Sequence, residues 1–354
     1  MRVGVFLAPV RDTPGHIALA EELGFSAAWC YDSPLLYQDP FVALARAAER
    51  TRRIGLGVGV LVPGLRAPVV TVAALRALTA LAPGRVRVAV GAGFTGRFTL
   101  GLGPVRLAEL EREVDDLRGL LAGDERAHPE GGRPVRDMPV PGAEGGGPVP
   151  IYVSCRGERA QALARRLGDG AMTGIFYPGG LGLLRRAIGP ELPLAVHAVG
   201  AVADEGEPLD SPRLRAAVGP VVAVAFHAFA EQPWRLDGLD AAVRAQAAEY
   251  VAAVAEAHPP ERRHQVLHRG HLVELALPQD DAVVTAANVA RFSLTGTAPE
   301  LRERAEALAA EGVTELAVQP GGDVPAELRR LASALLPAGA GPASPGAPDG
   351  PERR

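Results

Sequence analysis

The feature that most constrains the fold of this chain is a regular alternation of short apolar segments with helical segments, which begins at Arg2 and recurs almost to the end of the sequence. Near-continuous apolar runs of this kind are typical of parallel strands that are buried on both faces. The predicted strands are, in order, Arg2–Ala8, Ala27–Tyr31, Ile54–Val62, Val86–Gly91, Ile151–Ser154, Ala171–Ile175, Leu194–Val202 and Glu315–Val318. Eight strands with helices between most of them predict a (β/α)8 TIM barrel.

An open, doubly wound α/β sheet is the main alternative, because it also alternates strands with helices. The barrel is favoured because polar residues and glycines gather directly after the predicted strands, as in Asp32-Ser33 and Arg156-Gly157. The active sites of barrel enzymes are built from the loops at the carboxyl ends of the strands. A functional site is therefore expected at that face.

The predicted barrel is a single domain over residues 1–336 that carries two insertions. Residues 123–150 are rich in glycine, proline and charge, which predicts a loop and not a separate domain. Residues 203–298 contain helical segments dominated by alanine and valine, between the seventh and eighth predicted strands. Residues 337–354 consist largely of proline, glycine, alanine and serine, and they are expected to be disordered.

The charged residues exclude several classes of function. All 37 basic residues are arginine, because the chain contains no lysine. This excludes a Schiff-base lysine, a pyridoxal-phosphate anchor and a Walker phosphate loop. The formal net charge of −4 argues against a nucleic-acid-binding surface. Any bound anion must be held by arginine, by backbone N–H groups or by hydroxyls.

The hydropathy pattern and the cysteines predict the compartment. The sequence lacks an apolar run of about 20 residues, which argues against a membrane span. The N-terminal segment reads as a strand and not as a secretory signal. Cys30 and Cys155 are far apart and have neither metal-binding nor redox spacing. The expected location is the reducing cytoplasm.

The third predicted strand carries Gly55, Gly57 and Gly59 on one face. Glycine weakens a strand and often marks a place where something approaches the backbone closely. One interpretation is a smooth wall for a flat ligand, with Gly59, Val60 and Leu61 presenting backbone N–H groups. The alternative is a tightly packed barrel strand whose small residues make room for larger neighbours.

The segment from Gly91 to Gly96 matches the G-x-G-x-x-G pattern after a predicted strand. A dinucleotide site would require a helix that opens on the last glycine and an acidic residue at the end of the next strand. The acidic residues at the right distance, Asp115 and Asp116, fall within an amphipathic helical segment. We therefore interpret Gly91 and Gly93 as a glycine-rich strand end that lines a pocket.

Three further strand ends carry candidate binding residues. Asp32-Ser33 follows the second strand, where a carboxylate and a hydroxyl can bond a ring N–H or a sugar, although an Asx turn is an alternative. Arg156-Gly157 leads into a helix, and exposed N–H groups beside an arginine favour an anion. A surface ion pair is the alternative for Arg156. Thr173-Gly174 follows the sixth strand and would lie next to it in a barrel.

The histidines are the remaining candidates for chemistry. His268 and His271 have a spacing that can bind metal, but Gly270 lies between them and a third ligand is not evident nearby. No metal is therefore predicted, and His271 is a candidate general acid or substrate-binding residue. His197 and His227 are interpreted as structural, and Trp29 as strand packing.

Taken together, these stretches resemble the bacterial luciferase-like family and, within it, the deazaflavin-dependent branch that includes methylenetetrahydromethanopterin reductase. The resemblance covers roughly Arg2 to Gly322. It rests on the order and spacing of several stretches: Tyr31–Phe41, Ile54–Pro68, Val86–Gly93, Pro150–Gly174 and Thr295–Pro320.

The resemblance implies a barrel with an insertion between the last two strands, a homodimer, and coenzyme F420 or FMN held at the carboxyl ends of the strands. In deazaflavin members a cis peptide bond bulges after strand three behind the ring, which by similarity would be Gly59–Val60. Asp32 and Ser33 would lie near the ring or its polar linker. The phosphate would lie near Arg156, Gly157 and Thr173.

The activity that the resemblance implies is hydride transfer between C5 of the deazaflavin and a small organic substrate. Some relatives carry an acid after the strand-four glycines, where this chain has Phe94, so His271 is the expected substitute as proton donor. The alternatives are an FMN-dependent monooxygenase and a relative that binds cofactor without catalysis. A metal-dependent hydrolase is a more distant alternative.

Overall fold

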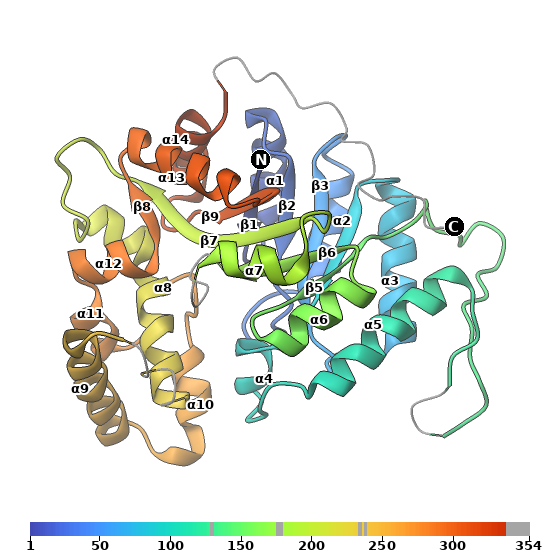
Figure 1. Cartoon of the computed structure of the whole chain (residues 1–354), viewed down its shortest axis with the longest axis horizontal. Coiled ribbons are helices and arrows are strands. Elements are labelled where there is room, and N and C mark those ends of the chain that lie inside the picture. The colour runs from blue at the N-terminus through green and yellow to red at the C-terminus, as the bar shows by residue number, and fades with distance from the viewer. Residues whose placement is uncertain (128–130, 175–179, 233–235, 237–238, 338–354) are drawn as a thin grey trace.

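The computed structural model describes residues 1–127, 131–174, 180–232, 236 and 239–337. These residues form a parallel sheet of nine strands, eight of which close into a barrel (Figure 1). The barrel strands are β1 (Arg2–Leu7), β2 (Ala27–Cys30), β3 (Gly55–Leu61), β4 (Val86–Val90), β5 (Ile151–Ser154), β6 (Gly170–Gly174), β7 (Leu194–Val202) and β9 (Glu315–Gln319).

The barrel is closed by pairings that an open sheet would lack. The order β6-β5-β4-β3-β2-β1-β9-β7 returns on itself because β6 also pairs with β7, where Ala171 lies opposite Leu194. At the other junction Arg2 of β1 lies opposite Glu315 of β9. The predicted (β/α)8 barrel is therefore confirmed, and the doubly wound sheet is excluded.

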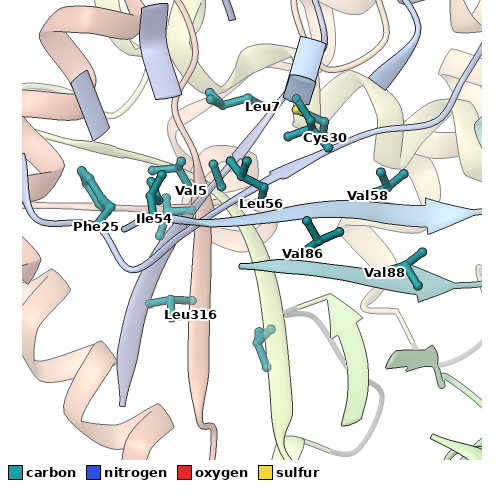
Figure 2. Close-up of a cluster of buried hydrophobic side chains, with 14 of the residues drawn as sticks. Val5, Leu7, Phe25, Cys30, Ile54, Leu56, Val58, Val86, Val88 and Leu316 are labelled. Atoms are coloured by element: carbon teal, nitrogen blue, oxygen red, sulfur yellow. The ribbon is translucent and has the colours of Figure 1, made fainter. Parts of the chain in front are cut away.

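The outer layer of helices follows from the apolar outward face of each strand. Val5 of β1 and Leu56 and Val58 of β3 are almost completely buried between the strands and the helices (Figure 2). Burying such side chains contributes about 1.5–3 kcal/mol each. The surrounding helices are α1 (Thr13–Leu23), α2 (Pro40–Ala48), α3 (Pro68–Leu81), α5 (Leu107–Ala122), α6 (Glu158–Leu167), α7 (Leu181–Ile188), α13 (Ala298–Ala310) and α14 (Val324–Leu335).

The barrel interior is filled by the alternate residues of the same strands. Aromatic rings dominate it: the ring centroids of Phe6 and Trp29 lie 6.4 Å apart, and those of Trp29 and Tyr152 lie 5.7 Å apart. Trp29 is completely buried and its indole N–H donates to Glu315 at 2.7 Å. The prediction that Trp29 packs within the strand layer is therefore confirmed.

The second insertion forms a helical layer beside the barrel, seen at the lower left of Figure 1. It lies between β7 and β9, as predicted, and comprises α8 (Pro212–Glu231), α9 (Ala241–Ala257), α10 (Pro260–His268), α11 (Pro278–Val283), α12 (Ala286–Phe292) and β8 (Leu294–Gly296). The strand β8 was not predicted. Its three residues pair with Gly200–Val202, because β7 continues beyond the closed part of the barrel.

Helix α8 is the centre of this layer. It is the one helix in the described ranges that is long and apolar enough to span a membrane, with a mean hydropathy of 1.3, which the sequence analysis did not anticipate. Sixty-one per cent of its most apolar window is buried within the fold. Its apolar residues, among them Val218, Val222 and Phe226, form a second hydrophobic cluster with α9 and the end of β7.

Several other expectations can be compared with the structure. In the first insertion, the described residues are irregular apart from one bridge between Arg126 and Val135. The glycine-rich segment after β4 contains one helical turn, α4 (Thr95–Phe98), which was not predicted. Ile175, predicted as the end of strand six, and residues 338–354 of the predicted disordered tail lie outside the described residues.

Acid pH is expected to weaken the junction between β7 and α8. The Arg213 guanidinium, with a further hydrogen bond from Ser211, lowers the pKa of Glu207 to about 2, although burial opposes this shift. Because its folded-state pKa is depressed, Glu207 contributes stability above pH 4.5 that is lost as the pH falls toward 2. Urea unfolding at pH 6 should therefore separate the wild type from Glu207→Gln, whereas at pH 3 the difference should shrink. Glu205→Gln, at an exposed neighbouring position, serves as the control, and a difference that does not change with pH would contradict this role.

Candidate active site

A cavity of about 270 Å³ lies at the carboxyl ends of the barrel strands, the face where barrel active sites occur. Its lining comes from the ends of β1 to β7 and the loops that follow them, with His271 from the insertion. The lining residues are Phe6, Tyr31, Asp32, Ser33, Gly59, Val60, Val62, Gly93, Phe94, Thr95, Gly96, Ser154, Arg156, Met172, Thr173, Gly174, His197 and His271.

A larger hollow, of about 1360 Å³, lies at the opposite end of the barrel. It is lined by Arg2, Pro193 and Thr314, among others, and by none of the residues predicted from the sequence. These residues precede the strands or begin them. Because the active sites of barrel enzymes lie at the carboxyl ends of the strands, the smaller cavity is the candidate active site.

Most of the predicted site residues meet in the smaller cavity. They are Asp32, Ser33, Gly59, Val60, Gly93, Arg156, Thr173, Gly174 and His271. These residues are as far apart in the sequence as Asp32 and His271. The closure of the barrel is therefore what brings them together. These polar strand ends therefore meet at one face of the barrel, and their roles in binding stay predictions.

Three predicted residues do not line the cavity. The Leu61 side chain is buried in the cluster between barrel and helices, because the register of β3 against β4 shifts between Gly59 and Leu61 and turns Leu61 outward. Gly91 lies behind the wall, since a Cβ there would be 3.0 Å from Val60. Gly157 is exposed at the N-terminus of α6.

The bulge of β3 forms the floor of the cavity. The register shift places Val60 at the cavity between two residues that pair with β4. The peptide bond between Gly59 and Val60 is cis, and this prediction is therefore confirmed. Gly91 accommodates the bulge, because any side chain at that position would meet Val60.

The interpretation of all three strand-three glycines as a ligand wall is wrong for two of them. A Cβ on Gly57 would lie 2.3 Å from the Trp29 ring, and one on Gly55 would lie 2.8 Å from the Arg87 side chain. Both glycines therefore make room for large residues inside the barrel, as the packing alternative stated. Gly59 alone among these three reaches the cavity.

Asp32 is a buried carboxylate at one side of the cavity. Arg66 binds it at 3.4 Å and also binds Asp39 at 2.7 Å. Asp39 in turn caps α2 through the N–H groups of Phe41 and Val42. Burial raises the pKa of Asp32, and the positive charge of Arg66 opposes this shift. Sequence analysis missed Arg66, although it lies only two residues after Gly64, where the breakers end the glycine strand.

Three hydroxyl side chains that line the cavity are available to a ligand. Ser33, Ser154 and Thr173 all contribute to the lining. None of their side-chain hydroxyls has a hydrogen-bond partner among the residues that the structure describes. Because a hydroxyl can both donate and accept, these groups are available to a polar ligand in the cavity.

His197 belongs to the cavity, although the sequence analysis interpreted it as structural. Its Nε2 lies 3.0 Å from Tyr31 Oη, which also hydrogen-bonds Gln319 Oε1. Burial lowers the pKa of His197 to about 4, with a hydrogen bond from Gln319 opposing the shift, so the ring is neutral at neutral pH. Its place as the one polar side chain in the apolar strand β7 was the signal that could have identified it.

His271 enters the cavity from the insertion on a tight turn. Gly270 and His271 both have positive φ angles, 77° and 38°, a conformation that costs a residue other than glycine about 1–3 kcal/mol. The ring contacts the Thr95 hydroxyl at 3.2 Å. Burial, followed by the effect of His268, lowers the pKa of His271 well below its usual value. The neutral ring can donate an N–H but holds no extra proton at neutral pH.

His227 and His268, the other two histidines considered as candidates, lie outside the cavity. His268 is bonded to Glu231, and His227 is bonded to Asp280 within the insertion, which supports the structural interpretation of His227. Within the described ranges, no group of three His, Cys, Asp or Glu side chains is placed to hold a metal ion.

Comparison with known proteins identifies the family. The model of the luciferase-like monooxygenase family matches residues 4–315. The chain belongs to this family. The predicted resemblance to the bacterial luciferase-like family is therefore confirmed.

The luciferase-like chain is also similar to individual proteins. It is 34% identical over 176 residues to an F420-dependent glucose-6-phosphate dehydrogenase of Beutenbergia cavernae, which covers 45% of this chain and 51% of the relative. It is 27% identical over 172 residues to a 5,10-methylenetetrahydromethanopterin reductase of Methanolobus tindarius, which covers 48% and 52%. The chain thus spans about half the length of the curated relatives it matches.

Solved structures share the fold of the luciferase-like chain. A coenzyme F420-dependent tetrahydromethanopterin reductase from Methanopyrus kandleri superposes with a TM-score of 0.64 at 19% identity, over 95% of this chain and 98% of that one. A monooxygenase from Streptomyces bottropensis superposes with a TM-score of 0.61 at 20% identity, over 95% and 99%. At these identities the similarity establishes the barrel fold.

Proposed function

We propose that this protein is a coenzyme F420-dependent oxidoreductase that transfers hydride between C5 of the deazaflavin and a small organic substrate. The observation that carries the proposal is the cavity at the strand ends, with the bare backbone of Gly59 and the bulged Val60 as its floor. Relatives named as F420-dependent glucose-6-phosphate dehydrogenases, of which the chain matches about half the length, support F420 over other cofactors.

The residues of the cavity fit a flat heterocycle with a polar, anionic tail. Gly59 and Val60 would lie behind the ring, because glycine leaves the backbone accessible there. Asp32 and Ser33 would bond the ring or the polar linker. Arg156, Thr173 and Gly174 would hold the phosphate, with Gly157 at the start of α6 contributing its backbone N–H. Gly93 lines the cavity and would leave room for the cofactor, because it has no side chain. Gly91 and Leu61 lie behind the wall and would support the bulge of β3.

The bound deazaflavin would supply the hydride, and the residues of this chain would position it and handle the proton. The hydride acceptor would lie over the free face of the ring. Tyr31, His197 and His271 present hydrogen-bonding groups to the same cavity. We propose His271 as the proton donor, because Phe94 stands where an acid could otherwise serve. Its neutral ring donates through an N–H.

Cofactor titration tests the proposal. Purified protein is titrated with F420 and, separately, with FMN, and binding is followed by quenching of cofactor fluorescence. The expected result is saturable binding of F420, reduction of the bound F420 by a secondary alcohol or sugar phosphate, and weaker binding of FMN. The second candidate is an FMN-dependent monooxygenase, and the similar fold of the Streptomyces bottropensis monooxygenase is compatible with it. Tight FMN binding with oxygen consumption, and no F420 binding, would establish this second candidate.

A third candidate is a relative that binds cofactor without catalysis. Phe94 in the cavity and the absence of lysine from the sequence are compatible with it. Binding of F420 without turnover on a broad panel of alcohols, sugar phosphates and pterins would favour this candidate. Turnover on any of them would remove it.

Removing the hydroxyls that line the cavity is expected to weaken F420 binding. Ser33→Ala and Thr173→Val should each raise the Kd by about 5–10-fold, since each removes one hydrogen bond worth about 1 kcal/mol. Ser333→Ala, at an exposed position on α14, is the matched control and should leave the Kd unchanged. Unchanged affinity in both cavity variants would place the cofactor elsewhere.

The substrate class, the location and the oligomeric state of the protein are also proposals. The substrate is a small molecule, because the cavity is small and lies deep in the barrel mouth. The protein acts in the cytoplasm, in keeping with two free, buried cysteines, and functions as a homodimer. Analytical ultracentrifugation of the purified protein tests the dimer, and a monomer at micromolar concentration would contradict it.

A further inference from the structure

The Asp32 carboxylate is held by fewer bonds than its burial requires. Its side chain is only 1% exposed, and the residue lines the cavity. Among the described residues, its oxygens accept hydrogen bonds from Arg66 alone, at 3.4 and 3.5 Å, which is long for an ion pair. A carboxylate has about four acceptor sites, and buried oxygens normally have partners. Asp32 therefore keeps acceptor capacity for a ligand.

The Asp32 carboxylate does not hold its own loop. An Asx turn, the alternative considered from the sequence, needs a backbone N–H two residues further on. That residue is Pro34, which has no N–H. The next turn of the loop is closed by Ser33 instead, whose carbonyl accepts the N–H groups of Leu36 and Tyr37. The Asx turn is thus excluded, and the carboxylate has no local structural task.

Arg66 is fixed in place by residues other than Asp32. Its Nη2 lies 2.7 Å from Asp39 Oδ2, and its guanidinium carbon lies 5.3 Å from the centre of the Phe41 ring. Asp39 is anchored in turn at the start of α2, where its other oxygen accepts the Phe41 N–H at 2.8 Å. The start of α2 therefore holds the guanidinium, which presents Nε and Nη2 to Asp32.

The position of Arg66 is unfavourable for the helix that follows it. Arg66 stands two residues before Pro68, the first residue of α3. The positive end of a helix dipole disfavours a cation there. The carboxylates of Asp32 and Asp39 compensate for this cost. The arginine at this position is therefore explained by the two carboxylates and not by the helix.

Two charged side chains act on Asp32. Burial raises the pKa of Asp32, Arg66 opposes this shift, and the like charge of Asp39 adds to it. Asp39 has the weaker effect, because its side chain is 38% exposed and water screens its charge. Arg97 of α4 donates to backbone carbonyls elsewhere, and His271 from the insertion is neutral at neutral pH. Arg66 is therefore the group that favours a charged Asp32.

We propose that Arg66 is a positioning residue that keeps the Asp32 carboxylate charged and oriented, so that Asp32 binds the N–H or O–H donors of the ligand. The inference rests on the proposed function, in which F420 is that ligand. It assigns to Asp32 the donor groups of the ring or of the polar linker. A carboxylate repels a phosphate, so Asp32 and Arg156 recognise different parts of the cofactor.

The first test is made without cofactor. In protein labelled with 13C at the aspartate carboxyl carbons, the Asp32 signal is assigned with Asp32→Asn and followed as the pH is changed. In Arg66→Met its titration midpoint should rise by about one pH unit, because no positive charge then opposes burial. An equal midpoint in the wild type and in Arg66→Met would overturn the proposal.

The matched control for both tests is Arg76→Met. The side chains of Arg76 and Arg66 are equally exposed, at 21%, and both form ion pairs. The partner of Arg76 is Asp137 in the first insertion, at 3.2 Å, and not a residue of the cavity. Arg76→Met should therefore leave both the Asp32 midpoint and the F420 affinity unchanged.

The second test measures the Kd for F420. Arg66→Met should raise the Kd by about 10-fold at neutral pH, since it weakens a charge-assisted hydrogen bond to the ligand. As the pH falls, this variant should lose affinity at a higher pH than the wild type, because Asp32 takes up its proton earlier. Arg66→Lys keeps the charge without the planar fork and should give an intermediate Kd. An unchanged Kd and pH profile in Arg66→Met would overturn the proposal.

A double variant tests whether Arg66 acts through Asp32. Asp32→Asn alone should weaken F420 binding, and adding Arg66→Met should then raise the Kd by less than about twofold. The double variant leaves neither charge of this pair buried, so it should fold even if Arg66→Met alone does not. A full 10-fold effect of Arg66→Met in the Asp32→Asn background would show that Arg66 acts independently and would overturn the proposal.

The outcomes separate this inference from the proposed function. If the wild type binds F420 and the Arg66 variants bind it equally well, the positioning role is wrong and the function stands. If the wild type does not bind F420, the proposed function fails. The titration of Asp32 in cofactor-free protein then decides by itself whether Arg66 keeps the carboxylate charged.

Discussion

Replacing Glu315 by glutamine is expected to lower the free energy of unfolding by about 3–5 kcal/mol. Glu315 is buried inside the barrel, where its carboxylate lies 2.8 Å from Arg87 and accepts the Trp29 N–H at 2.7 Å. Glutamine has the same shape and keeps the acceptor for Trp29. It removes the negative charge, however, and leaves the Arg87 guanidinium buried without its counter-ion.

The pKa of Arg87 has the same physical cause. Burial, the largest single influence, would lower the pKa of Arg87, but the charge of Glu315 acts together with Tyr152 and the hydrogen bonds to both residues, and the pKa of Arg87 is raised. The guanidinium is also placed over the Trp29 ring, 5.0 Å from its centroid. Arg87 therefore stays charged in the folded protein, and the loss of its partner is not relieved by deprotonation.

Chemical denaturation of purified protein measures this effect. The matched control is Glu111→Gln, which breaks an exposed ion pair with Arg166 and should cost at most about 1 kcal/mol. A double variant, Arg87→Met with Glu315→Leu, should recover much of the stability, because it leaves no buried charge. A loss below 1 kcal/mol in Glu315→Gln would show that Arg87 reaches solvent. F420 affinity should not change in folded protein, because this pair lies below the cavity.

Replacing Gly57 by alanine is expected to lower the free energy of unfolding by about 3 kcal/mol. The added Cβ would lie 2.3 Å from Cε3 of Trp29, within a rigid ring and well inside the contact limit. Trp29 cannot move away, because it is completely buried and held by its bond to Glu315. The strand β3 must therefore shift, and its pairing with β2 and β4 would be distorted.

Gly15→Ala is the matched control for Gly57→Ala. A Cβ on Gly15 would meet nothing within 4 Å, and the residue lies in α1. Alanine there should leave the stability unchanged or raise it by up to about 1 kcal/mol. If Gly57→Ala retained the stability of the wild type but lost F420 affinity, the glycine would serve the ligand after all, and the packing interpretation would be wrong.

The arrangement of the strands was largely predictable because it depends on local pattern. Apolar runs such as Ile151–Ser154 and Leu194–Val202 are buried on both faces, and a chain with this many parallel strands has few ways to cover them. The strand β8 escaped prediction because its three residues, Leu294–Gly296, carry no periodicity of their own. They form a strand because β7 extends past the barrel and offers a free edge.

The membership of the candidate site was predictable only in part. Asp32, Arg156 and Thr173 were found because polar residues after a strand point to the carboxyl face. Arg66 and His197 were missed, since one follows a turn and the other lies within an apolar strand. Arg66 is linked to the site through the lining residue Asp32, whereas His197 lines the cavity itself and bonds Tyr31. Only the closed barrel brings these partners, which are distant in sequence, near one another.

The sequence by itself determined the barrel, the position of the insertion and the face on which a site would form, because each of these follows from the order and spacing of apolar segments. The tertiary structure decided what the glycines of β3 do. Gly55 and Gly57 make room for Arg87 and Trp29, and Gly59 reaches the cavity. The physical reason is that a glycine in the sequence shows only that a side chain is absent. The neighbour that fills the space comes from another strand, so it is fixed only when the strands pack together.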